Sequence, residues 1–370
     1  MSPHTVSRLA ATLAAVAAAG AVAAAAILIP GRAIAPREFG QDTAATPRST
    51  TTKLATPEEI LADGCGFEHG PGVLPNGDSG YSNRTVGFAL RFDDEVNPYS
   101  LMSAFVLPGD TLELVAVLTD RDGDFAAAAE AGDLERTGAE SWRWTAPPAT
   151  GVHRIHVKDL HADETMCLNA VVVEPYKGEE VLDGYRIGRY ETVPLRGLET
   201  YRVPEGFVRL TPEVLDLFVS PHFQLRQFVC KQASDFPKFL RIRTRMLLKL
   251  EMLLEEVNEA GHDADTFAVL SGYRTPWYNR TIGNRTKYTR HAYGDAADVY
   301  VDRDGDGWMD DLTGDGRATR ADARVLYDLV EDATEETWYQ PLVGGLGLYG
   351  AKPHRGPFIH VDTRGYRARW

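Results

Sequence analysis

The alternation of short β-forming runs with turns between residues 60 and 176 constrains the fold of this chain more than any other feature. The runs are VGFALRF, LMSAFVL, DTLELVAVL, SWRWTA, VHRIHV and LNAVVVEPY. Turn signals such as PGD, DRDGD and PPATG separate them. Short strands at this spacing are typical of an all-β sandwich. We therefore predict a β-sandwich domain over residues 60–176.

Part of this region is similar to a known class of module. The run PGDTLELVA, followed by WRWTAPPATGVHRIHV, resembles bacterial immunoglobulin-like modules of surface proteins. The resemblance implies an immunoglobulin-like sandwich. Cys65 and Cys167 bracket the module, and outside the cytoplasm we expect a disulfide between them, with two unpaired thiols as the alternative. Cys230 has no acid–base partner that the sequence identifies, so we interpret it as a small buried hydrophobe.

The first 35 residues indicate export. Arg8 precedes an uncharged apolar run over residues 9–29, a pattern typical of a signal peptide or a membrane anchor. Residues 33–35 fit a cleavage site, but Pro36 disfavours cleavage, so an uncleaved anchor is slightly favoured. The membrane is then a partner, with the short side cytoplasmic. Both interpretations place the rest of the chain in the periplasm or cell envelope, and a buried Ala-rich helix is the third alternative.

The remaining chain divides into a linker, a connector and a second domain. A length of 370 residues favours two domains. Residues 36–59 are rich in Thr, Ala and Pro, which predicts a flexible linker. We expect residues 177–207 to form an extended connector and residues 208–370 a second domain. In that domain, leucines at three- and four-residue steps predict one helix face ending near Gly261, made of Leu247, Leu250, Leu253 and Leu254.

The charge balance argues against one class of partner. The chain has 39 Lys and Arg residues against 53 Asp and Glu residues, a net charge of −14. No basic block offsets the acidic excess, and nucleic-acid binders normally carry one. We therefore expect no nucleic-acid partner.

Three segments of the second domain carry residues suited to metal chemistry. They are SGYRT (residues 271–275), HAYGDAAD (residues 291–298) and FIHVDTRG (residues 358–365). A catalytic zinc usually takes three protein ligands from His, Asp and Glu. His291, Asp298 and His360 can supply them. Asp362 shares a strand face with His360, and a carboxylate there can orient the imidazole or activate water.

These three motifs in this order, with GGLGLYG before the last, resemble the zinc D-Ala-D-Ala carboxypeptidases of peptidase family M15, in the branch that ends in HVD. The resemblance implies an α+β domain with an antiparallel sheet and flanking helices. It implies zinc ligation by His291, Asp298 and His360, and substrate contact by Arg274, which helps to stabilise negative charge at the attacked carbonyl. The implied reaction is hydrolysis of bonds involving D-amino acids in peptidoglycan peptides, as a carboxypeptidase or an endopeptidase.

The catalytic base is where this chain departs from the family. Many members carry an acid three residues before the last zinc ligand, and here that position is Pro357. Asp362 is the first candidate base and His354 the second, although Asp362 could serve only to hold His360. In a third interpretation Asp362 ligates the metal and His360 is the base. The absent acid also keeps open a different function, that of a non-catalytic cell-wall-binding protein with a retained peptidase fold.

An acidic insertion over residues 302–322 contains two overlapping calcium patterns. The first uses Asp302, Asp304 and Asp306, but its twelfth position is Thr313, which cannot bind calcium through two oxygens. The second matches the EF-hand plan at five ligand positions, which are Asp311, Thr313, Asp315, Thr319 and Asp322. We predict a structural calcium site here, with a solvated acidic turn capped by Thr319 as the alternative. The third functional hypothesis is a calcium-dependent adhesion or assembly module that acts through the β domain.

Overall fold

The computed structural model describes residues 55–62, 65, 81–118 and 123–370. The predicted leader at residues 1–35 and most of the linker lie outside the described residues. At the end of the predicted linker the chain forms helix α1 (Pro57–Ala62). Within the described ranges, no helix combines the length and the apolar character needed to cross a membrane.

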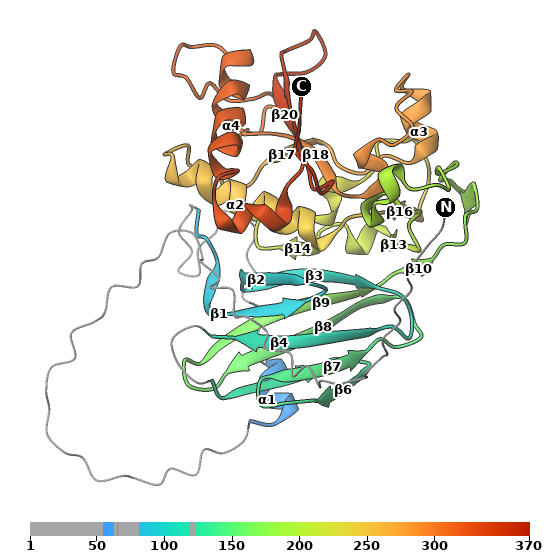
Figure 1. Ribbon diagram of the computed structural model, residues 1–370, viewed down its shortest axis with the longest axis vertical. Coiled ribbons are helices and arrows are strands. Elements are labelled where there is room, and N and C mark those ends of the chain that lie inside the picture. Colours follow the sequence, from blue (N-terminus) through green and yellow to red (C-terminus); the bar gives the residue numbers. More distant parts are fainter. Residues whose placement is uncertain (1–54, 63–64, 66–80, 119–122) are drawn as a thin grey trace, which may run out of the picture.

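The first half of the described chain is a two-sheet β structure (Figure 1). One sheet has the order β2-β1-β4-β7-β6, and the other has the order β3-β9-β8-β5. Alternation decides which side chains enter the core. In β4, for example, Leu112, Leu114 and Ala116 are buried while their neighbours are more exposed. The strands are β1 (Thr85–Phe92), β2 (Glu95–Tyr99), β3 (Leu101–Val106), β4 (Thr111–Val117), β5 (Phe125–Ala129), β6 (Asp133–Arg136), β7 (Ser141–Thr145), β8 (Gly151–Asp159) and β9 (Glu164–Val172). The predicted all-β region is confirmed at this level.

The structure has the predicted disulfide and the predicted buried free cysteine. Cys65 and Cys167 form a disulfide, with their Cα atoms 5.7 Å apart. The bond ties a residue near α1 to the buried strand β9. Cys230 is free and buried, as expected for a small hydrophobe.

The second half combines a sheet with helices. Its main sheet has the order β17-β18-β20-β19-β21, and all neighbours in it are antiparallel except β19 and β21. The predicted leucine face is buried in α2 (Thr244–Glu259). The other helices are α3 (Pro276–Thr281) and α4 (Arg320–Ala333). The sheet strands are β17 (Ala268–Ser271), β18 (Ala296–Tyr300), β19 (Gly345–Tyr349), β20 (Phe358–Asp362) and β21 (Ala368–Arg369).

Short elements link the two halves. Three small sheets pair β10 (Glu174–Pro175) with β13 (Gly206–Leu210) and β16 (Lys238–Leu240), β11 (Val181–Leu182) with β12 (Tyr185–Arg186), and β14 (Phe218–Ser220) with β15 (Phe223–Gln224). The predicted connector at residues 177–207 is not simply extended. It packs onto the second half, where Tyr185, Ile187 and Tyr201 are buried and the Tyr190 hydroxyl donates to the Ala292 carbonyl over 2.7 Å.

The two halves share one continuous hydrophobic core. Figure 1 shows the β structure lying beneath the helices, with β2 and β3 on the side nearest α2 and β14. Polar contacts cross the same boundary. The Thr244 hydroxyl donates to the Ser103 carbonyl over 2.8 Å, and Arg245 Nε lies 2.5 Å from Glu95 Oε1. The structure is therefore β-rich, its two halves pack against each other, and it is compatible with a multidomain fold.

Candidate metal centre

Adjacent strands bring two of the three predicted ligands together. β18 and β20 are antiparallel, and in their register Asp298 lies directly opposite His360. His291 comes from a 3-10 turn, Arg290–Tyr293, that ends at Gly294 with a φ of 73°. A Cβ at Gly294 would lie 2.6 Å from the backbone carbonyl of Arg241, so this close turn requires glycine. The turn directs the chain into β18 and places His291 beside the other two residues.

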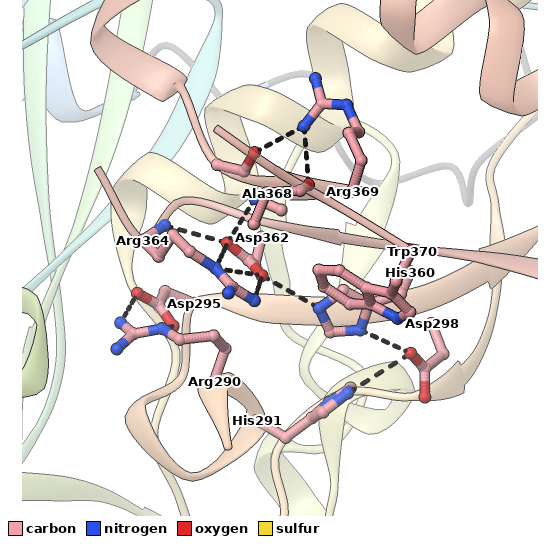
Figure 2. A network of polar contacts seen from close by, with 12 residues as sticks. Arg290, His291, Asp295, Asp298, His360, Asp362, Arg364, Ala368, Arg369 and Trp370 are labelled. Atoms are coloured by element: carbon pink, nitrogen blue, oxygen red, sulfur yellow. Dashed lines mark hydrogen bonds and ion pairs between the residues drawn. The ribbon is translucent and has the colours of Figure 1, made fainter. Parts of the chain in front are cut away.

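The three side chains form a tight, buried cluster (Figure 2). Asp298 Oδ1 lies 2.8 Å from His360 Nδ1 and 3.3 Å from His291 Nε2. One ligand atom from each residue lies within 4.8 Å of the others. The side chains of all three are at most 8% exposed. The predicted trio, spread over 70 positions of the sequence, is thus brought to one point.

The outer nitrogen of each imidazole is held by a neighbour. His291 Nδ1 lies 2.7 Å from the Gly272 carbonyl, and His360 Nε2 lies 3.1 Å from Asp362 Oδ2. The remaining nitrogens, His291 Nε2 and His360 Nδ1, face the Asp298 carboxylate. Two imidazole nitrogens and one carboxylate oxygen, each imidazole supported from behind, are a donor set that fits zinc.

Burial and hydrogen bonding set the charges in the cluster. Burial lowers the pKa of His291. Burial also acts to lower the pKa of His360, but hydrogen bonds to Asp298 and Asp362 outweigh it and raise this pKa to about 9. Burial acts to raise the pKa of Asp298, and the two histidines hold it well below its usual range instead. The cluster therefore contains an ionised carboxylate that attracts a positive charge.

Asp362 is buried behind His360 and is not part of the cluster. It accepts hydrogen bonds from the Gly345 backbone amide over 2.8 Å and from Arg364 Nε over 2.9 Å. Figure 2 shows its carboxylate between Arg364 and the His360 ring. Burial acts to raise its pKa, while the bonds to His360 and Arg364 hold the pKa well below its usual range. A carboxylate with its oxygens so engaged is a weak acceptor for another proton.

Arg274 contacts the carboxylate oxygen of Asp298 that does not face the two histidines. Its Nη2 lies 2.5 Å from Asp298 Oδ2, and its Nε donates to Ser271 Oγ over 2.6 Å. Arg274 and the three clustered residues open onto a pocket of about 460 Å³. Asp298 is the only Asp or Glu that lines this pocket in the part of the chain that the structure describes.

The candidate base His354 is placed elsewhere. It is exposed in a turn closed by a bridge between Lys352 and Arg355, and it does not line the pocket. The structure therefore places Arg274 and Asp362 in contact with residues of the cluster and leaves His354 away from it.

Sequence reasoning missed several residues of the site. Arg364 holds Asp362, and the Trp370 ring lies 5.1 Å from the His360 ring. Arg364 stood within FIHVDTRG, so its motif was the available signal. Lys249 had none, because it lies on α2 and reaches the Asp362 carbonyl over 2.8 Å, 113 positions away.

The acidic insertion forms two turns in series. In the first, the carboxylates of Asp302, Asp304 and Asp306 gather within 4.8 Å of one another. The structure gathers no such group from Asp311, Asp315 and Asp322 within the described residues, although the sequence favoured that second pattern. Both Asp322 oxygens instead accept backbone amides, from Leu312 over 2.9 Å and from Thr319 over 2.6 Å.

Thr319 caps the turn, as the alternative to a calcium site predicted. It is the N-cap of α4, its hydroxyl accepts from the Ala321 amide, and Asp322 completes a capping box. Calcium binding by the insertion stays a prediction.

Comparisons with protein-family models, curated proteins and solved structures find no match to this chain. The conclusions about function therefore depend on the geometry of the site and on the motif resemblance.

Proposed function

We propose that this protein is an exported zinc-dependent peptidase that hydrolyses bonds involving D-amino acids in peptidoglycan peptides. The convergence of His291, Asp298 and His360 carries the proposal. Surface acids cluster often, but two imidazoles with supported outer nitrogens around one buried carboxylate are characteristic of metal sites. The substrate class comes from the resemblance of the three motifs, in their order, to the zinc D-Ala-D-Ala carboxypeptidases. In the same proposal, the sandwich is an immunoglobulin-like module and the chain acts outside the cytoplasm.

The chemistry follows from the residues around the cluster. Zinc bound by this set supplies a Lewis acid that polarises a peptide carbonyl and lowers the pKa of water. Gly272 and Asp362 fix the two imidazole rings. Arg274 faces the pocket beside Asp298, so its guanidinium is placed to stabilise negative charge on a carbonyl oxygen. The pocket holds the peptide segment next to these groups.

One observation favours a second function. Among the described residues the pocket offers no Asp or Glu side chain besides the proposed ligand Asp298, and Pro357 occupies the family's acid position. Asp362 is engaged with His360 and Arg364, so we assign it to orienting His360. A peptide would then bind at the metal without a strong base beside it. The second candidate is a non-catalytic wall-binding protein with the same zinc site.

The test is digestion of purified sacculi by the full chain loaded with zinc. Released fragments are identified by mass spectrometry, and bound zinc is measured by elemental analysis. His291→Ala is the test variant, and His161→Ala, at an exposed position of the β structure, is the matched control. The proposal expects loss of terminal D-Ala or of cross-links with wild type and His161→Ala only.

The other outcomes separate the two candidates. One bound zinc and sacculus binding without cleavage would support the wall-binding function. Failure of wild type to bind zinc would overturn both.

A further inference from the structure

A second cavity, of about 330 Å³, lies between the β structure and the second domain. Its walls come from five parts of the chain. These are the hairpin at residues 93–95, Phe105 of β3, the connector at residues 199–200, the segment at residues 241–245 that leads into α2, and Thr363 just after β20. The cavity is separate from the metal pocket, since the two share no lining residue.

One wall of this cavity carries hydrogen-bond donors without acceptors. Arg241 Nε is buried and has no hydrogen-bond partner, and Arg241 takes part in no ion pair among the described residues. Thr363 is 1% exposed, and its hydroxyl also has no partner within the described part of the chain. Leaving such buried polar groups unpaired costs roughly 1–3 kcal/mol each, which a ligand that accepts their hydrogen bonds would recover.

The start of α2 adds to the same wall. Arg243 is the N-cap of this 16-residue helix, it makes no capping bond, and the first turn contains no acid. The first amides of a helix have no acceptor within the helix, and the helix dipole favours negative charge there. Arg243 donates only to backbone carbonyls, from Nε to Tyr293 over 3.2 Å and from Nη2 to Thr200 over 3.5 Å. Among the described residues no carboxylate forms a direct ion pair with Arg243, although the charges of Asp295 and Glu199 act on its guanidinium from a greater distance.

Four acidic residues line the other side of the cavity, and two of them form ion pairs with arginines. Glu95 pairs with Arg245 over 2.5 Å, and Glu199 pairs with Arg202 over 2.6 Å. Asp93 and Asp94, in the exposed turn between β1 and β2, form no ion pair with a described residue. Among the described residues the cavity thus has two arginines without a direct ion pair on its inner wall and two acidic residues without one at its rim. Burial and the neighbouring Asp94 and Asp110 raise the pKa of Asp93.

We propose that this interdomain cavity binds a small amino-acid-like zwitterion. Its carboxylate lies against Arg241, Arg243, the Thr363 hydroxyl and the first turn of α2, and its ammonium group lies toward Asp93 and Asp94. A multiply charged anion would meet the rim carboxylates, so inorganic phosphate is disfavoured. A bare ammonium would meet the inner guanidinium groups. The site needs no metal and is independent of the proposed peptidase activity.

The site also connects to the metal centre through the backbone. Thr363 follows Asp362, and its amide donates to the Asp295 carbonyl over 3.0 Å. Arg243 donates from its backbone amide to the Gly294 carbonyl over 2.9 Å, in the turn that leads from His291 to Asp298. A ligand held in the cavity would therefore stiffen two segments that carry metal ligands.

The test is a titration of the full chain followed by saturation-transfer NMR of methyl signals. The probes are L-alanine, D-alanine, acetate and methylammonium, with inorganic phosphate as a competitor. Saturable binding of alanine at least tenfold tighter than that of acetate or methylammonium is expected. Equal binding of acetate, or displacement of alanine by equimolar phosphate, would overturn the assignment.

Two variants test the placement. Arg241→Gln is expected to weaken alanine binding at least tenfold, because a charge-assisted hydrogen bond contributes about that much. Thr363→Val keeps the side-chain shape and removes a hydroxyl that has no partner in the free protein. It is expected to weaken binding about fivefold without lowering the melting temperature. Arg189→Gln, at an exposed arginine paired with Glu180, is the control. Unchanged binding in both test variants would contradict the site.

Discussion

His360 and Asp362 lie two positions apart on β20, and their side chains meet on one face of the strand, with His360 Nε2 3.1 Å from Asp362 Oδ2. This pair leaves His360 Nδ1 toward Asp298, 2.8 Å away. The alternation of a strand places both side chains on one face, and the buried carboxylate fixes which imidazole nitrogen reaches the cluster.

Asp362→Asn is expected to weaken zinc binding by about 10- to 100-fold, because the amide no longer supports the imidazole as a ligand. Competition with a chromophoric chelator measures the affinity. Asp328→Asn on the exposed side of α4 is the control. If Asp362 is the catalytic base, the variant keeps wild-type zinc affinity and loses only turnover, which would refute the orienting role.

Replacing both Cys65 and Cys167 by Ser is expected to lower the free energy of unfolding by about 2–4 kcal/mol, because their disulfide closes a loop of 102 residues. Urea denaturation of the full chain, with and without a reducing agent, measures the change. Cys230→Ser controls for the loss of a cysteine. A reducing agent that leaves the unfolding midpoint of wild type unchanged would contradict this prediction.

Lys249 predicts a pH-dependent stability. Its burial lowers the pKa to about 7 in the folded protein, below the usual value of about 10.4. Between these values the unfolded state binds the extra proton, so stability rises with pH, by up to about 1.4 kcal/mol per pH unit. Below pH 7 both states are protonated, and the full cost of burying the charge remains.

Comparison of unfolding free energies at pH 7.0 and 9.5 tests this. The rise is expected to be smaller in Lys249→Met than in wild type, whatever the absolute stability of the variant. Lys287→Met, at an exposed lysine, should keep the wild-type slope. Parallel slopes for wild type and Lys249→Met would show that the buried amine keeps its proton throughout.

Asp322→Asn is expected to destabilise the acidic insertion and the start of α4 by about 2 kcal/mol. Its two carboxylate oxygens accept backbone amides of Leu312, Thr313 and Thr319, and an amide side chain can replace only part of these acceptors. Hydrogen exchange at residues 311–322 reports the local effect. Protection equal to that of wild type would mean that other contacts hold the loop.

The sequence predicted the local elements and the residues of the candidate site. Strand alternation and turn residues predicted the β-rich first half, and leucine spacing predicted the buried face of α2. His291, Asp298 and His360 were predicted as a group because His and Asp are common zinc ligands and because the order of their motifs resembles that of a known peptidase family. Periodicity and residue type involve residues that are close in the sequence, so they can be recognised before the tertiary structure is known.

Tertiary structure decided everything that depends on pairing between distant segments. The register of β18 and β20 placed Asp298 opposite His360, the Gly294 turn brought in His291, and Arg364 engaged Asp362 while His354 stayed in an exposed turn. The burial of Lys249 and the interdomain cavity both result from the packing of α2 against the β structure and against the rest of its own half. Such contacts leave no local pattern, because burial against residues more than 100 positions away is set by the whole core and not by neighbouring side chains.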